Sequence, residues 1–132
     1  MNYLNRKCPC GSGLKYKKCC QVYHLGKRAP NALILMKSRY SAYAFSQLKY
    51  IEKTTYQIKE NLEDFRRQVL AFSQNTDFKG LKILNFSDEG DKAFVTFHAQ
   101  LSSSKQDLSF TEKSSFIKEN DTWYYVEGVL EE

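Results

Sequence analysis

The stretch CPCGSGLKYKKCC, residues 8–20, decides how the N-terminal part of the chain folds, because it contains every cysteine of the protein. A Cys-X-Cys pair, eight further residues and a Cys-Cys pair allow one short loop to bring four thiolates around a single ion. Zinc binds four thiolates in tetrahedral geometry, and a zinc ion with four protein ligands has no open position for water or substrate. We therefore predict one zinc ion with a structural role, bound by Cys8, Cys10, Cys19 and Cys20.

The same cysteines have alternative uses. Two disulfides would close small, strained rings, because one pair is adjacent and the other is separated by a single residue. Redox-active thiols usually occur as Cys-X-X-Cys beside a βαβ unit, and the sequence has neither feature. His24, four residues after Cys20, is an alternative zinc ligand that would replace one of the cysteines.

Residues 8–20 resemble the SEC-C motif, a small zinc knuckle found at the C-terminal end of the protein-export ATPase SecA and in other bacterial proteins. By position, Cys8, Cys10 and Cys19 match the first three ligands of that motif. Cys20 stands where the fourth ligand is Cys or His. The SecA knuckle resembles a docking element for partner proteins, so the resemblance implies binding of a partner protein here too.

Charge is distributed unevenly along the chain. Residues 1–50 contain ten Lys or Arg and no Asp or Glu, whereas residues 51–132 contain ten basic and 15 acidic residues. A basic surface attracts phosphate backbones or acidic proteins, although lysines can also merely solvate a knuckle and balance its thiolates. A protein or ribonucleoprotein partner is the leading hypothesis, and binding of nucleic acid or the ribosome is an alternative. The residues expected to contact the partner are Lys15, Tyr16, Lys17 and Lys18.

Length and composition predict a folded protein of the cytoplasm. The chain has 132 residues, enough for one compact domain besides the knuckle, and its hydrophobic content of 42% argues against disorder. No apolar run approaches the roughly 20 residues that cross a membrane. The N-terminal residues MNYLNRKC lack the apolar core of a secretory signal. These features and reduced thiols together predict a cytoplasmic location and no membrane span.

Helical spacing follows the knuckle. Residues 21–31 have the composition of a linker that ends in Asn31, a typical helix N-cap residue. Apolar residues recur at intervals of three and four over residues 32–51, which predicts one long helix. A second amphipathic helix is predicted over residues 60–72, and its inward face consists of Leu62, Phe65, Val69 and Phe72.

Beyond residue 80 the period becomes two. Strands are predicted over residues 81–86, 92–101, 108–118 and 122–129. The strand over residues 92–101 has apolar groups on both faces and is predicted to be central in the sheet. Helices followed by an antiparallel meander indicate an α+β fold. We predict a zinc knuckle over residues 1–25 and an α+β domain over residues 26–132.

Two further stretches are similar to the YchJ-like family of small bacterial proteins, namely LILMKSRYSAYAF at residues 33–45 and SSFIKENDTWYYVEG at residues 114–128. The resemblance implies an N-terminal SEC-C knuckle before a domain similar to nuclear transport factor 2. In that domain a curved antiparallel sheet packs on N-terminal helices to form a cone. The resemblance implies a fold and a zinc site but no reaction.

An enzyme or small-ligand carrier that uses the cone is the alternative function. His98 is the candidate general base in such a pocket, with Glu112, or Tyr40 and Arg39, as its partners. The opposing interpretation is that His98 is a packed strand residue and that Arg39 and Tyr40 brace the helix against the sheet. The sequence contains no carboxylate pair, glycine-rich phosphate loop or nucleophile elbow, so it favours a binding protein over an enzyme.

Overall fold

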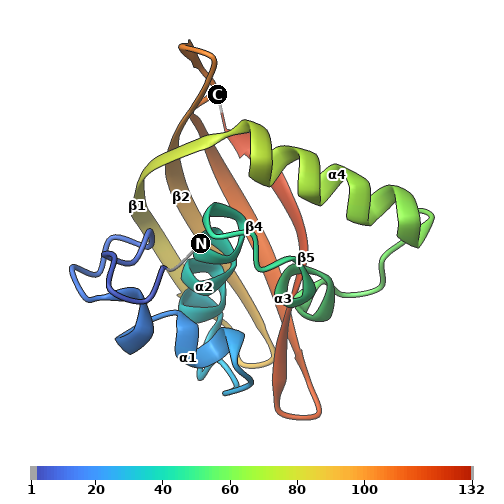
Figure 1. Cartoon of the computed structure of the whole chain (residues 1–132). Coiled ribbons are helices and arrows are strands. Elements are labelled where there is room, and N and C mark those ends of the chain that lie inside the picture. The colour runs from blue at the N-terminus through green and yellow to red at the C-terminus, as the bar shows by residue number, and fades with distance from the viewer. Residues whose placement is uncertain (1–2, 132) are drawn as a thin grey trace.

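The structure is a computed structural model and describes residues 3–131. Figure 1 shows the helices in front of an antiparallel sheet. The helical elements are η1 (Tyr16–Lys18), α1 (Gln21–His24), α2 (Ala32–Ala44), α3 (Leu48–Thr54) and α4 (Leu62–Asn75). The strands are β1 (Asp77–Asp88), β2 (Lys92–Ser103), β3 (Gln106–Asp107), β4 (Phe110–Glu119) and β5 (Thr122–Glu131). The predicted α+β fold, with helices before the sheet, is confirmed.

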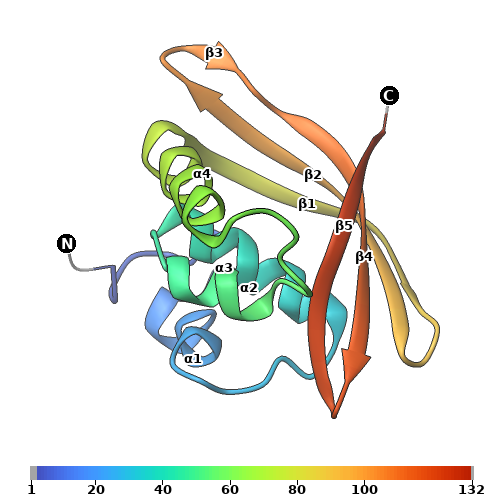
Figure 2. The ribbon, with the colours of Figure 1, turned by 90° about the vertical axis from the view of Figure 1, so that its right-hand side faces the viewer.

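The sheet is curved, and its long strands follow the order β1-β2-β4-β5, with β3 paired to the end of β2. Strand β2 is therefore central, as the apolar residues on both of its faces predict. Register shifts interrupt the ladder between β1 and β2 and the ladder between β4 and β5, and such irregularities bend a sheet. Figure 2 shows that the concave side of the sheet faces the helices.

The main core lies between this concave side and α2. Alternate residues of β2 are buried in it: Ala93, Val95, Phe97, Ala99 and Leu101. Phe116 of β4 and Trp123 of β5 belong to the same cluster. Because side chains alternate along a strand, the intervening residues of β2, including His98, lie on the opposite, convex face.

Helix α2 lies between the sheet and the knuckle. It begins as predicted at Asn31, whose Oδ1 accepts a hydrogen bond of 2.8 Å from the backbone N–H of Ile34. Toward the sheet, the hydroxyl of Tyr40 donates to the carbonyl oxygen of Gly80 at 2.8 Å. A helix with packing partners on opposite sides needs no solvated face, so α2 is buried around most of its circumference.

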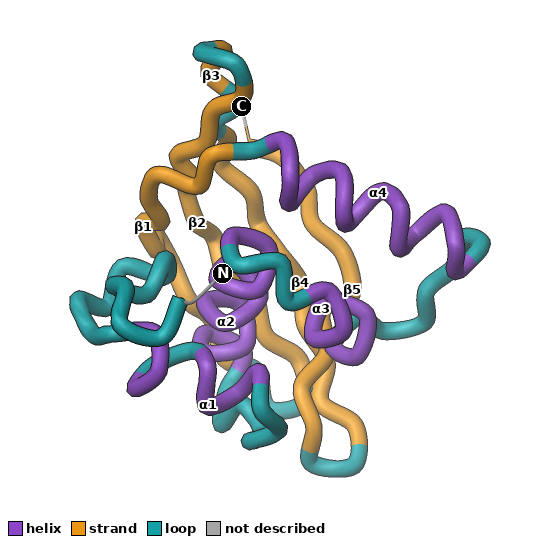
Figure 3. The backbone as a smooth tube through the Cα atoms, in the orientation of Figure 1, coloured by secondary structure: helices purple, strands orange, loops and turns teal. Residues whose placement is uncertain are grey.

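The prediction of one long helix over residues 32–51 is wrong, because the structure contains α2 and α3 there (Figure 3). Helix α2 ends at Ala44, and Ser46 adopts a left-handed φ of 55°. The ring of Phe45 is buried in the apolar cluster of the knuckle, where it stacks on Tyr3 with ring centroids 4.0 Å apart. The backbone N–H of Phe45 still donates to the carbonyl oxygen of Ser41 as in a helix, so the break falls at the left-handed Ser46, directly after the residue that packs in the knuckle.

Helix α4 packs against α2 and α3. Its predicted inward face is correct for Val69, which is buried, and for Phe72, whose ring packs on Tyr43 and Phe78 although it is 37% exposed. It is wrong for Leu62, which is 41% exposed. The reason for the exposure of Phe72 is that it lines a cavity together with Phe65 and Val69. None of the helices in residues 3–131 has the length and apolar character required to cross a membrane.

Candidate functional site

The knuckle closes through a short antiparallel contact on either side of its turn. The backbone N–H of Cys8 donates to the carbonyl oxygen of Leu14 at 2.8 Å. The intervening turn contains Gly11 and Gly13, with φ of 86° and 85°. These values lie in the left-handed region, where a residue with a Cβ is strained, so the two glycines allow the chain to reverse directly after the first cysteine pair.

The four cysteines converge on one point. Their Sγ atoms all lie within 4.8 Å of one another, and the Sγ atoms of Cys10 and Cys19 are 3.6 Å apart. In a tetrahedral site with Zn–S bonds of about 2.3 Å, sulfur atoms are roughly 3.8 Å apart. All four are free cysteines, and all but Cys19 are buried. The donor set and its spacing therefore fit a tetrahedral metal ion.

The thiols also interact electrostatically. Hydrogen bonds from the Cys10 and Cys20 thiols lower the pKa of Cys8, whereas hydrogen bonds with Cys10 and Cys8, together with burial, raise the pKa of Cys20. Thiols this close cannot all ionise unless a cation neutralises them. A divalent cation would stabilise the four thiolates together, so any metal that binds here would displace their protons.

Two serine hydroxyls lie next to the sulfur atoms. The hydroxyl of Ser41, in the buried part of α2, is 3.3 Å from Sγ of Cys8. On the opposite side, the hydroxyl of Ser12 is 3.2 Å from Sγ of Cys19. Hydroxyls donating to thiolates offset the net charge of about −2 that four thiolates leave on a divalent ion. Sequence reasoning missed Ser41, because α2 also contains Lys37, Ser38 and Arg39 and no local pattern distinguishes this serine from them.

His24 does not belong to this donor set. Its Nε2 lies 2.8 Å from the carbonyl oxygen of Ser38, and its Nδ1 lies 2.5 Å from the hydroxyl of Tyr16. A carbonyl only accepts, so Nε2 carries the proton and Nδ1 accepts from Tyr16. Both ring nitrogens are thus occupied, and the structure gives no support to His24 as a replacement ligand.

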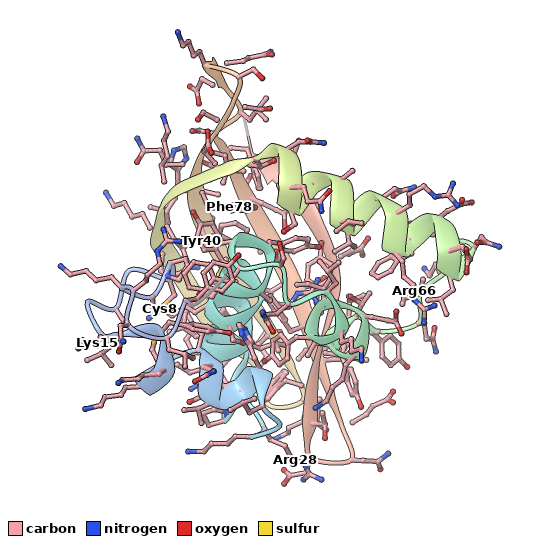
Figure 4. The ribbon with its side chains drawn as sticks, viewed as in Figure 1. Cys8, Lys15, Arg28, Tyr40, Arg66 and Phe78 are labelled. Carbon is pink, nitrogen blue, oxygen red and sulfur yellow. The ribbon has the colours of Figure 1, made fainter. Side chains whose placement is uncertain are left out.

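The residues predicted to contact a partner fall into two groups. Tyr16 is only 3% exposed, because its ring packs against Phe45 and His24 inside the knuckle. Tyr16 was expected to contact a partner, but its burial gives it a role inside the knuckle instead. Lys15, Lys17 and Lys18 are exposed, and Figure 4 shows Lys15 pointing away from the body while Cys8 lies closer to it.

The cone encloses a cavity of about 310 Å³ between the sheet, α2 and α4. Arg39, Tyr40 and Glu112 line it. His98 does not, because it lies on the convex face, where its Nδ1 is 2.9 Å from the hydroxyl of Thr111. The structure thus brings together three of the predicted pocket residues and separates the expected general base from them.

A four-cysteine knuckle that precedes an α+β cone defines a class of protein, the SEC-C-motif proteins with a nuclear transport factor 2-like domain. The family model described as "SEC-C motif" matches residues 5–21. The model described as "YchJ, middle NTF2-like domain" matches residues 31–128. The chain belongs to the YchJ-like family.

Relatives and solved structures are similar along nearly the whole chain. A UPF0225 protein of Enterobacter sp. (strain 638) is 35% identical over 128 residues, which cover 95% of this chain and 84% of that protein. A SEC-C motif containing protein from Rhodopseudomonas palustris, solved in solution, is 32% identical with a TM-score of 0.80, covering 95% of this chain and 98% of that one. A SEC-C motif containing protein from Psychrobacter arcticus, solved as a crystal, is 26% identical with a TM-score of 0.82, covering 100% of this chain and 86% of that one. The predicted family is thereby confirmed.

Proposed function

We propose that the knuckle binds one structural zinc ion through Cys8, Cys10, Cys19 and Cys20 and uses its outer surface to bind an acidic protein partner. The observation that carries this proposal is the division of the knuckle into two sides. The four Sγ atoms converge beside α2, whereas the side chains of Lys15, Lys17 and Lys18 extend into solvent. Four thiolates fill a tetrahedral site, so the ion organises the surface and leaves no position for a substrate.

The charge of this surface favours an acidic partner. None of the three lysines forms an ion pair with any of residues 3–131, and residues 1–50 contain no Asp or Glu that could neutralise them. Unpaired cations on a small rigid loop attract a partner of opposite charge and orient it during association.

Apolar groups on the same part of the chain favour a protein over a nucleic acid. The knuckle and α1 expose four large aliphatic side chains: Leu4, Leu14, Val22 and Leu25. Leu4 and Leu25 line one shallow groove, and Leu25 is 78% exposed. Exposed aliphatic groups can form the apolar core of a protein interface, with the lysines at its polar rim, whereas single-stranded nucleic acid is bound by stacking on exposed aromatic rings. The knuckle keeps Tyr16 buried, so this ring is not available for stacking.

The experiment is quantitative capture of binding proteins from cell extract, comparing the wild type with the variant Lys15→Glu, Lys17→Glu, Lys18→Glu. A matched control carries the same charge change on the body, Lys53→Glu, Lys59→Glu, Lys82→Glu, at three exposed lysines. We expect the knuckle variant to lose the captured partner and the control to keep it, while both retain their zinc. Equal capture by both variants contradicts the proposal, and capture that disappears on nuclease treatment identifies the partner as nucleic acid.

Two further parts of the proposal concern organisation and location. We propose that residues 1–25 act as the docking unit and residues 26–132 as its support. We also propose a cytoplasmic location, since the thiols must remain reduced to bind zinc.

A further inference from the structure

Arg39 is a buried cation in the wall of the cone cavity. It is 7% exposed, and Nη1 donates to the carbonyl oxygen of Ile51 at 3.2 Å and to the hydroxyls of Thr54 and Thr55 at 2.7 and 3.1 Å. These acceptors belong to the C-terminal end of α3, where a cation is favourable because the helix dipole is negative there. This half of the guanidinium therefore has a structural role.

The other half of the guanidinium faces the cavity. Nε and Nη2 of Arg39 make no hydrogen bond with any of residues 3–131, and no buried side-chain nitrogen or oxygen in that range lacks a partner. Both nitrogens are therefore in contact with open space, and the open space next to Arg39 is the cavity. In an arginine these two nitrogens form the planar edge that binds a carboxylate through two parallel hydrogen bonds.

No carboxylate of the described chain forms an ion pair with Arg39. The ring of Tyr125 lies 4.4 Å from the guanidinium carbon and supplies a cation–π contact instead. Burying a cation without a counter-ion is costly, and burial lowers the pKa of Arg39. The site thus has a positive group with two free donors and, among residues 3–131, no carboxylate in ion-pair contact with it.

Glu112, the nearest candidate counter-ion in the cavity wall, is held by other residues. Its carboxylate accepts a hydrogen bond of 2.6 Å from the hydroxyl of Ser114. It also lies directly over Gly128 on the neighbouring strand, where a Cβ would be 2.1 Å from Oε2. Because Gly128 has no side chain, the carboxylate can rest against β5, where it attracts Arg39 across the cavity wall without forming an ion pair.

The remaining wall of the cavity is mainly apolar. Its large rings come from α2, α4, β1, β2 and β4: Tyr43, Phe65, Phe72, Phe78, Phe97 and Phe110. A volume of about 310 Å³ is at the lower end of the range for small-molecule sites, which combine apolar walls with a few placed polar groups.

We propose that the cone cavity binds a small monocarboxylic acid, with its apolar body between the rings and its carboxylate on Nε and Nη2 of Arg39. This site is separate from the proposed docking surface of the knuckle, so either can be wrong without affecting the other. The cavity would make the protein a carrier or sensor of such an acid. No reaction is part of the proposal.

The test uses pairs of probes that differ only in charge. The acids benzoate, phenylacetate, 3-phenylpropionate and octanoate are each titrated beside the corresponding amide into the full-length protein and followed by two-dimensional NMR. We expect at least one acid to bind roughly tenfold or more tightly than its amide, since hydrogen bonds to a charged group contribute about that factor. The side-chain Nε–H signal of Arg39 should shift during this titration. Equal affinity of every acid and its amide, or no binding by any acid at millimolar concentration, overturns the proposal.

Two variants test the role of Arg39. Arg39→Met should abolish the preference for the acid, whereas the matched control Arg28→Met, at an exposed arginine paired with Asp121, should keep it. A preference retained in folded Arg39→Met overturns the proposal. If Arg39→Met does not fold, the Arg39 Nε–H signal of the wild type decides: a shift with the acid and not with the amide supports the proposal, and no shift overturns it.

Discussion

The hydroxyl of Tyr16 donates a hydrogen bond of 2.5 Å to Nδ1 of His24, and the opposite nitrogen of that imidazole donates to the carbonyl oxygen of Ser38 at 2.8 Å. This chain of contacts links η1, α1 and α2, so a neutral histidine connects the knuckle to the domain. The imidazole also packs on the ring of Tyr50, with centroids 4.7 Å apart. We infer that the orientation of the knuckle depends on these contacts as well as on the metal.

Removal of the Tyr16 hydroxyl tests this connection. Tyr16→Phe should lower the free energy of unfolding by about 1–3 kcal/mol, because it leaves Nδ1 of His24 without a partner in a largely buried place. Tyr56→Phe is the control, since its hydroxyl contacts Glu119 at an exposed position and its loss should cost less than the loss of the Tyr16 hydroxyl. Denaturant unfolding measures both. If both variants lose the same free energy of unfolding, the buried contact between Tyr16 and His24 stabilises the protein no more than the exposed one.

Metal content tests the four-cysteine site. Elemental analysis of protein purified without chelator should find one zinc ion per chain in the wild type and none in Cys8→Ser or Cys19→Ser. Circular dichroism should show that the sheet domain stays folded in both variants, since the main core lies between the sheet and α2. A wild type that contains no metal, with thiols that react freely, would refute the site.

The hydroxyl of Ser41, next to Cys8, is expected to strengthen metal binding. Ser41→Ala should weaken zinc binding by about tenfold to a hundredfold, the range found when groups that hydrogen-bond to metal ligands are removed. The smaller alanine fits the buried position, so the fold should be retained. Competition with a chromophoric chelator measures the affinity. Ser12→Ala is the comparison, because the hydroxyl of Ser12 is exposed and its loss should have a smaller effect. Identical affinities in wild type and Ser41→Ala would show that this contact does not act on the thiolate.

The buried histidine makes stability depend on pH. Burial lowers the pKa of His24 from its ordinary value of 6.5, so below that pH the unfolded chain binds a proton that the folded chain does not. Stability is therefore complete above pH 6.5 and falls as the pH decreases toward the folded-state pKa. Denaturant unfolding of the wild type and of His24→Gln, above pH 6.5 and about one unit below it, measures the effect.

The variant His24→Gln separates the protonation of His24 from the loss of metal at low pH. Protonation of the cysteines at low pH weakens both proteins alike. Only the wild type also loses stability through protonation of His24 in the unfolded chain. We expect the wild type to lose more stability than His24→Gln over this interval. Parallel curves for the two proteins would indicate that His24 titrates as an exposed residue.

Local patterns in the sequence were enough to predict the elements that form through neighbours. The spacing of Cys8, Cys10, Cys19 and Cys20 indicated the metal site because a short loop restricts where its own thiols can go. Asn31 indicated the start of α2 because an N-cap acts on the next turn of the same helix. The alternation along residues 92–101 indicated a central strand because side chains change face at every residue.

The tertiary structure alone decided the features that depend on distant partners. Helix α2 ends where the ring of Phe45 packs in the knuckle, although the periodicity continues to Ile51. The convex face holds His98 outside the cone, because the curvature of the sheet determines which face is enclosed. The C-terminal end of α3 accepts hydrogen bonds from Nη1 of Arg39, and the rest of the guanidinium lies toward the cavity. Sequence periodicity records which side chains share a face, but only the packing of separate elements determines what that face meets.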